Sequence, residues 1–268
     1  MRKVDAIYHY TTVSSAVNII QSGKIFACDA KYLNDANELT FATKLFCHAI
    51  SERYNISINL FNILNNFTRS YCVSCFSESP EILSQWKSYS NDGKGLCLGF
   101  SRSIINHTSG PYPSKLVNCV YDNHDEFINN IINNNQCDID SIISISKGIM
   151  RGDTDLEKQR KSIDNIYTEL LRIKNKNFHE EREVRLIFCV PTMETKKLVK
   201  NDVIIPYIEH PFCEDEKRRY MWCHIPEIWL GPKCDSRNDD AIKSFMQLGW
   251  NLNSEDGFGT YRFDCGYR

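Results

Sequence analysis

Two glutamates and an arginine, spaced two residues apart, have the types and spacing best suited to chemistry in this chain. They lie in the stretch Phe178 to Cys189, which reads FHEEREVRLIFC. Successive side chains of a β-strand point to opposite faces, so Glu181, Glu183 and Arg185 would share one face, with the two glutamates about 7 Å apart along the strand. One interpretation is a solvent-facing edge strand whose charges discourage aggregation, and the stretch alone favours it. The other is a catalytic Glu-x-Glu pair presented by a rigid element.

The composition is that of an ordinary globular protein without a strong charge bias. The 268 residues include 32 Lys+Arg and 34 Asp+Glu, which argues against sequence-independent binding of polyanions but leaves a local basic groove open. No apolar run approaches the length of a membrane span, and the N-terminus lacks the apolar segment of a secretory signal. With twelve cysteines and no such signal, we expect reduced thiols, a cytoplasmic protein and no membrane partner.

The cysteine spacing does not indicate a metal site. Cys72 and Cys75 have Cys-x-x-Cys spacing, but they lie in a strand-like run that would send their side chains to opposite faces. No second cysteine or histidine pair follows at zinc-finger spacing. We therefore expect buried free thiols and no metal.

The chain opens with a predicted strand over 6–12, which carries His9, Tyr10 and Thr11. A helix capped by Thr12 or Ser14 and ended by a glycine should follow, and then a short strand over 24–28. Taken alone, His9 is most simply a partly buried histidine with satisfied hydrogen bonds.

A second pair of elements carries aromatic residues. A strand over 70–76 leads into a predicted helix with Ser79 as its cap and Pro80 at its first position. Trp86 and Tyr89 fall on one face of that helix. We expect Trp86 to pack on the sheet, whereas Tyr89, at the helix end, could present its ring to a planar ligand.

The remaining elements predict an α+β domain. An asparagine-rich segment over about 124–177 keeps helical periodicity, which predicts an insertion of two or three helices. Later strands are expected over 203–209, where Pro206 suggests an edge or a bulge, and within 226–234 and 260–263. Strands and helices alternate irregularly, so we predict a single domain over 1–268 with a mainly antiparallel or mixed sheet and flanking helices.

Taken in order, these motifs resemble those of the ADP-ribosyltransferase fold, in which three motifs sit on core strands around a split sheet. The three are the His9 strand, the segment from Ser74 to Tyr89, and the Glu181-x-Glu183 strand. Over most of its length the chain also resembles a widespread bacterial family of unknown function. The shared blocks are YHYTT at 8–12, LNDANE at 33–38, VSCFSES and QWKSYS within 73–90, GLCLGF at 95–100, FHEEREVRLIF at 178–188 and EIWLGP at 227–232.

The resemblance implies that NAD is a co-substrate, and it implies roles for residues of the three motifs. Cleaving the nicotinamide–ribose bond builds an oxocarbenium-like ribose, which Glu183 would stabilise. Glu181 would orient or deprotonate the acceptor. The remaining implied roles are a hydrogen bond donated to the adenosine ribose by His9, nicotinamide amide binding by the Tyr10 backbone, loop support by Thr11, nicotinamide stacking by Tyr89 or Trp86, and pairing of Arg185 with a diphosphate or with Glu183.

The resemblance leaves several alternatives open. The acceptor can be RNA, DNA or protein, and the enzyme can be a bacterial toxin or phage-defence effector with an antitoxin or other regulatory partner. An NAD glycohydrolase would differ only in using water. A non-catalytic ligand-binding module would use Glu183 as a structural partner of Arg185. A metal-dependent nuclease would use Asp35, Glu38 and Glu183, although the first two have capping-box spacing and so a simpler explanation.

Overall fold

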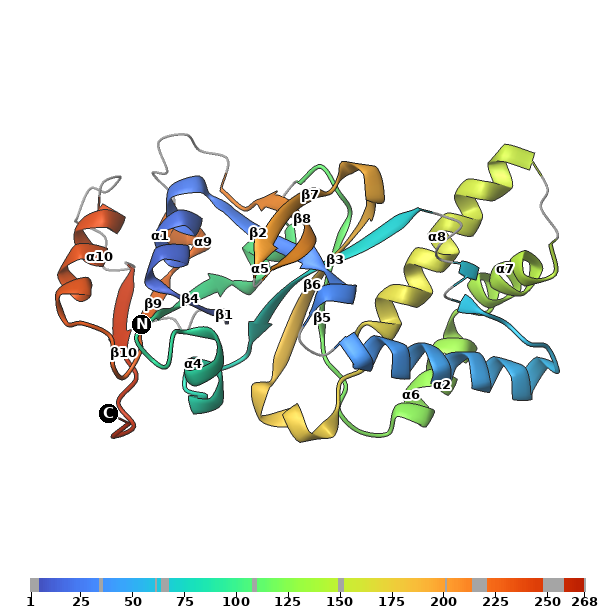
Figure 1. Cartoon of the computed structure of the whole chain (residues 1–268), viewed down its shortest axis with the longest axis horizontal. Helices are drawn as coiled ribbons and strands as arrows, with labels where there is room; N and C mark the ends of the chain where they lie inside the picture. Colours follow the sequence, from blue (N-terminus) through green and yellow to red (C-terminus); the bar gives the residue numbers. More distant parts are fainter. Residues whose placement is uncertain are drawn as a thin grey trace.

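A ten-stranded, mostly antiparallel sheet runs through the computed structural model, with helices at both ends (Figure 1). The structure describes residues 5–33, 36–60, 62–63, 68–107, 110–148, 152–200, 202–213, 221–247 and 258–267. The strands are β1 (Ala6–Thr11), β2 (Lys24–Asp29), β3 (Arg69–Ser77), β4 (Leu96–Ser101), β5 (Ser114–Asn118), β6 (Glu183–Pro191), β7 (Lys196–Lys200), β8 (Val203–Pro211), β9 (Glu227–Leu230) and β10 (Gly259–Arg262). The α-helices are α1 (Val13–Ser22), α2 (Ala36–Tyr54), α4 (Leu83–Tyr89), α5 (Arg102–His107), α6 (His124–Asn134), α7 (Gln136–Ser146), α8 (Gly152–Leu170), α9 (Met221–His224) and α10 (Arg237–Gln247). The predicted α+β class is confirmed: among the strands of the described residues, β9 and β10 pair in parallel and the other strand pairs are antiparallel.

The sheet forks at β3. One edge of β3 pairs with β6 along its whole length, from Arg69–Pro191 to Ser77–Glu183. The other edge is shared, because β2 pairs with it only at residues 72 and 73, and β1 only at Ser77. β1 and β2 therefore diverge, and the sheet continues as β1–β4–β9–β10 on one branch and β2–β8–β7 on the other.

Two hydrophobic cores cover opposite faces of the central strands. Along β6, Val184, Leu186 and Phe188 join the core under α1, α9 and α10, while Ile187 joins the core under α2, α6, α7 and α8. This alternation follows from the two-residue period of a strand, as predicted for Val184 to Phe188. The helices of the second core gather at one end of the molecule (Figure 1).

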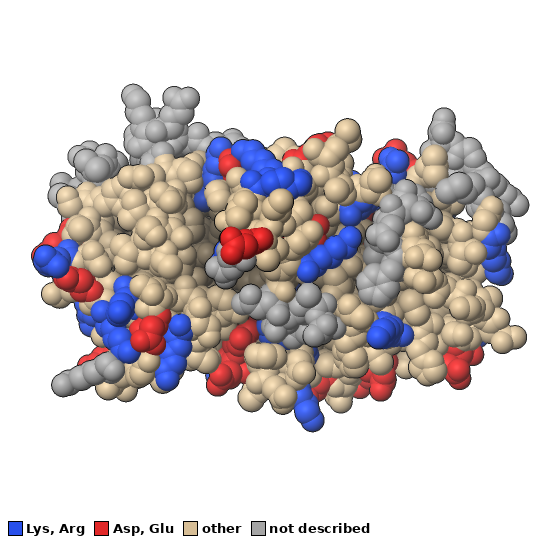
Figure 2. Space-filling view, viewed as in Figure 1, with Lys and Arg blue, Asp and Glu red and all other residues tan. Residues whose placement is uncertain are grey.

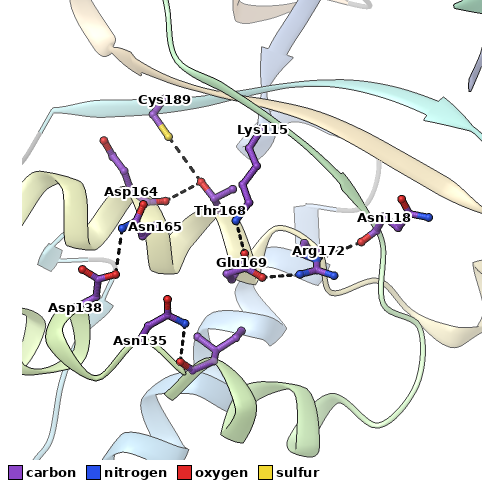
Figure 3. Close-up of polar contacts among 11 residues, drawn as sticks. Lys115, Asn118, Asn135, Asp138, Asp164, Asn165, Thr168, Glu169, Arg172 and Cys189 are labelled. Atoms are coloured by element: carbon purple, nitrogen blue, oxygen red, sulfur yellow. Dashed lines mark hydrogen bonds and ion pairs between the residues drawn. The ribbon is translucent and has the colours of Figure 1, made fainter. Parts of the chain in front are cut away.

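Polar contacts fasten α8 to the sheet (Figure 3). Lys115 on β5 donates a 2.5 Å hydrogen bond to Glu169, which also accepts a 2.7 Å bond from Arg172. On β3, Arg69 and Tyr71 both donate to Asp164 of α8. The residues just after α8 are consequently held at a fixed place beside β6.

Three local expectations are wrong. β6 begins at Glu183 and not near Phe178, because residues Lys176–Glu181 form a short 3-10 helix, η2, and Arg182 adopts a left-handed conformation with φ of 44°. β6 is also an internal strand between β3 and β5, so the edge-strand interpretation fails. Finally, β8, which contains Pro206, is not an edge strand. It lies between β2 and β7, and β7, which the sequence did not predict, occupies the edge.

A fourth expectation fails at α4, which begins at Leu83 with Ile82 as its cap instead of at Ser79. The Tyr10 hydroxyl donates to the Ser79 carbonyl and accepts from the Ile82 N–H, and the indole of Trp86 donates to the Pro80 carbonyl. These side chains form hydrogen bonds with backbone groups of the extended segment before the helix. The extended segment stands where the serine cap was predicted.

Candidate functional site

A cavity of about 470 Å³ opens at the fork of the sheet. Ser74, Cys75 and Phe76 of β3, at the position where β1 and β2 diverge, form part of its wall. The volume falls within the range of about 300–1,000 Å³ that small-molecule sites occupy. Of the predicted site residues, those that line the cavity are His9, Tyr10, Tyr89, Glu181, Glu183 and Arg185.

His9 reaches across the fork from β1 to β3. Its Nδ1 lies 2.9 Å from the carbonyl oxygen of Cys75, and because a carbonyl only accepts, Nδ1 carries the proton. Burial lowers the pKa of His9 below its usual 6.5, which favours the neutral ring and makes Nε2 a hydrogen-bond acceptor. Toward a ribose hydroxyl, a neutral ring with the proton on Nδ1 would accept the hydrogen bond at Nε2, whereas the donor role that the resemblance implies needs a proton on Nε2.

Glu183 and Arg185 form a buried, two-pronged ion pair on β6. Nε and Nη2 of Arg185 lie 2.9 and 3.0 Å from the two carboxylate oxygens of Glu183. Only 7% of Glu183 and 4% of Arg185 is exposed, and Nη1 of Arg185 donates to the Leu171 carbonyl at 2.7 Å. The sequence left two partners open for Arg185, a diphosphate or Glu183, and the structure shows the pair with Glu183.

Lys174 completes the charged cluster and was not singled out from the sequence. Its Nζ lies 2.8 Å from Oε2 of Glu181 and 2.8 Å from Oε2 of Glu183, and its side chain is 3% exposed. Glu181 belongs to η2 and not to the strand, so Lys174 joins two carboxylates that come from different elements. The only sequence signal was a lysine at the end of the helical segment, which a solvated position explains equally well.

The charges in this cluster balance. Burial opposes the ionisation of Glu183, but the charges of Arg185 and Lys174 outweigh it and lower its pKa to about 2. Burial likewise disfavours the charged form of Lys174, but Glu183 and Glu181 raise its pKa above the usual value. Burial and the charge of Glu183 raise the pKa of Cys75, so this residue stays a thiol and donates a hydrogen bond to Glu183. The site thus holds an ionised carboxylate that is largely buried.

The two aromatic candidates lie in different environments. Tyr89, the last residue of α4, lines the cavity and is 39% exposed. Trp86 is completely buried and packs edge-on against Tyr10, at 5.0 Å between ring centroids. The structure therefore brings Tyr89 to the cavity and not Trp86. Thr11 is also buried, at 8% exposed, outside the residues that line the cavity.

Two of the three acids considered for a nuclease site lie outside what the structure describes. Asp35 lies outside the described residues, as does the side chain of Glu38. Within the described ranges, no group of three His, Cys, Asp or Glu residues is arranged to hold a metal ion. Likewise, no described helix combines the length and the apolar character that crossing a bilayer requires.

Comparison with known proteins finds that part of the chain is similar to a family of unknown function. Residues 85–186 match the model of the family described as "Protein of unknown function (DUF2971)". The resemblance to a family of unknown function is confirmed over this range, which includes Tyr89, Lys174, Glu181, Glu183 and Arg185 but not His9. No curated protein and no solved structure matches the chain.

Proposed function

We propose that this chain is an NAD-dependent ADP-ribosyltransferase that modifies a macromolecule and uses the cavity at the fork of the sheet. The observation that carries the proposal is convergence. His9, Tyr89 and Glu183 come from three separate elements spread over most of the chain, yet all three line one cavity. The matched family has no assigned activity, so the support comes from the geometry and from the motif order.

The charge of Glu183 suits the cleavage of a glycosidic bond. Departure of nicotinamide leaves positive charge on the ribose, as in glycoside cleavage, and a fixed carboxylate stabilises that charge as it develops. Glu183 is ionised and is oriented by Arg185 and Lys174 before any substrate arrives. Glu181, on the same lysine, is the candidate that orients the acceptor.

The cavity walls offer groups that fit a dinucleotide. The Nε2 of His9 is an acceptor for a ribose hydroxyl, and the ring of Tyr89 offers a face for a planar base. Arg185 is occupied by Glu183 and by the Leu171 carbonyl, so it is not assigned to the diphosphate. Lys200 also lines the cavity and is exposed.

The test uses NAD labelled in its adenylate part, cell lysate and the purified chain. We expect label on a macromolecule and release of free nicotinamide, both abolished in Glu183→Gln. Glu180→Gln is the matched control, because Glu180 is exposed on η2, three residues before Glu183, and should retain activity. No transfer and no nicotinamide release by the wild-type chain would contradict the proposal.

One observation favours a second candidate, a non-catalytic ligand-binding module of the same fold. The Glu183 carboxylate already accepts from Nε and Nη2 of Arg185, from Lys174 and from the Cys75 thiol. A carboxylate offers about four acceptor sites, so a ribose hydroxyl must displace one donor, and the thiol is the weakest of them. Calorimetric binding of NAD without nicotinamide release would select this candidate.

The labelled reaction also separates transfer from hydrolysis. Free ADP-ribose as the sole product would indicate an NAD glycohydrolase, which uses water as the acceptor. If the enzyme is a toxin or a phage-defence effector, expression of the wild-type chain should slow bacterial growth and expression of Glu183→Gln should not. A regulatory partner such as an antitoxin would then be sought by its ability to relieve that effect.

A further inference from the structure

The branch of the sheet formed by β2, β8 and β7 has one face outside the core. Ile25, Ala27 and Ile208 point into the core and are at most 2% exposed. Their neighbours along the same strands point the other way. We call this opposite surface the lysine–aromatic face, and its residues are Lys24, Phe26, Lys196, Lys200 and Tyr207.

The face carries two aromatic rings, of which Phe26 is exposed and Tyr207 is partly buried. Phe26 is 47% exposed and packs against Tyr207, with 4.7 Å between the ring centroids. An exposed phenylalanine on a sheet face loses the contribution that its burial would make to stability, so packing alone does not account for it. A planar ring open on one side can stack with another planar group.

The lysines give the face a positive balance. The side chains of Lys24 and Lys196 are 44% and 58% exposed, and both pair with the single carboxylate of Glu209. Lys200 is exposed at the end of β7, and Asp202 lies in the turn between β7 and β8. Across the face, three lysines are set against Glu209, and Figure 2 shows Lys and Arg side chains gathered over β7 and β8. This local charge contrasts with the net charge of −2 for the whole chain.

The face is continuous with the cavity. Phe26 and Lys200 line the cavity as well as the face, and the cavity is also lined by the paired residues Leu198 of β7 and Ile205 of β8. Two further exposed rings stand in the cavity wall, Tyr32 at 43% and Tyr89 at 39% exposed. A chain lying across the face would therefore lead directly to the carboxylates of Glu181 and Glu183.

From this arrangement we infer that the acceptor is a single-stranded nucleic acid, which lies on the lysine–aromatic face with one base directed into the cavity. Exposed rings that stack bases, together with lysines that contact phosphates, are the two components of single-strand binding surfaces, and a sheet face bearing aromatic rings is one way to present them. That this nucleic acid is the acceptor rests on the proposed transferase activity, whereas its binding to the lysine–aromatic face does not.

The binding test measures fluorescence anisotropy of a labelled single-stranded oligonucleotide of mixed sequence, titrated with the purified full-length chain at several salt concentrations. We expect binding that weakens as salt rises. Phe26→Ala should weaken binding about fivefold or more, the lower end of the effect of removing a stacking ring. Phe41→Ala is the control, since Phe41 is also 47% exposed but lies on α2, and it should bind like the wild type.

Two lysines of the same strand provide a matched comparison of charge. Lys200→Ala should reduce the slope of log affinity against log salt by about 0.7, the value for one phosphate contact with a single strand. Lys197→Ala should leave that slope unchanged, because Lys197 alternates to the opposite face of β7 and bonds to Thr195. Equal effects of the two variants, or no binding by the wild-type chain, would overturn the inference.

The outcomes separate this inference from the proposed function. Oligonucleotide binding without any NAD cleavage would contradict the transferase proposal and leave the binding surface standing. NAD cleavage with label on proteins, no label on the oligonucleotide and no binding of it would overturn the inference and leave the transferase standing. Label on the oligonucleotide that is reduced in Tyr207→Ala, with nicotinamide release by that variant retained, would support both, because Tyr207 packs against Phe26 on the face but is not among the residues that line the cavity.

Discussion

Glu183 holds a negative charge at a position where the solvent can do little to stabilise it. Its folded-state pKa of about 2 lies below the value of 4.5 for an unperturbed glutamate. A group with a lowered pKa contributes stability above its unfolded pKa and loses that contribution as the pH falls. We therefore expect the free energy of unfolding to decrease between about pH 4.5 and about pH 2.

Denaturant unfolding of wild type and Glu183→Gln over this pH range is the measurement. The wild type should lose stability more steeply than the variant, because the glutamine cannot titrate. Arg185 and Lys174 would remain charged in both proteins. Parallel pH profiles for the two proteins would show that the ion cluster does not contribute in this way.

Lys174 gives a second prediction at the residue scale. Lys174→Met removes the cation that Glu181 and Glu183 share, and removing one partner of a buried ion pair costs about 3–5 kcal/mol. Lys176→Met is the control, because Lys176 is exposed, and a surface change should stay within about 0.5 kcal/mol. Thermal unfolding of both variants measures the difference, and equal melting temperatures would contradict a structural role for Lys174.

At the scale of elements, the junction between η2 and β6 sets the positions of the two glutamates. Arg182 has φ of 44°. Its carbonyl accepts a hydrogen bond from the backbone N–H of Glu78 at 3.1 Å, and the carbonyl of Glu181 accepts one from the Ser77 hydroxyl at 2.7 Å. A left-handed conformation costs an ordinary residue about 1–2 kcal/mol, and a β-branched residue tolerates it poorly.

We therefore predict opposite effects for two substitutions of Arg182. Arg182→Gly should leave stability unchanged or raise it slightly, because glycine adopts positive φ without a steric cost. Arg182→Val should lower the free energy of unfolding by about 1 kcal/mol or more and shift Glu181 away from Lys174. Chemical denaturation ranks the two variants, and a valine variant as stable as the glycine variant would contradict the role given to this junction.

The alternation of Val184, Leu186 and Phe188 was predictable from the sequence, because the period of a strand is a local property. The position of Glu181 was not, since nothing in FHEERE distinguishes a continuing strand from a helical turn followed by a left-handed residue. Lys174 was missed for a related reason: its importance comes from two carboxylates on other elements. The burial of Glu183 depends on the pairing of β6 with β3 and β5, which is a long-range contact.

At the scale of the molecule, the core under the helices supports the site from behind. Ile166 of α8 is fully buried in that core with Ile187 of β6, and α8 is followed closely by Leu171 and Lys174. Ile166→Ala should cost about 2–5 kcal/mol through lost burial and a cavity. Ile204→Ala, at a site 62% exposed, should change stability by less than about 0.5 kcal/mol.

Equilibrium unfolding in denaturant measures both isoleucine variants. If the helical core supports the charged cluster, the Ile166→Ala variant should also lose NAD binding at a lower denaturant concentration than the wild type. Loss of stability in Ile166→Ala without earlier loss of binding would mean that the cluster holds its geometry independently of α8.

The central claim is that residues from separate elements converge to place a carboxylate against the sugar from which nicotinamide departs. Nicotinamide release from NAD by the purified chain tests it most directly, with His9→Ala and Glu183→Gln beside Glu180→Gln. We predict release by the wild type and by Glu180→Gln, a loss of about a hundredfold or more in Glu183→Gln, and a smaller loss in His9→Ala. Release that is equal in all four proteins, or absent from the wild type, would contradict the account.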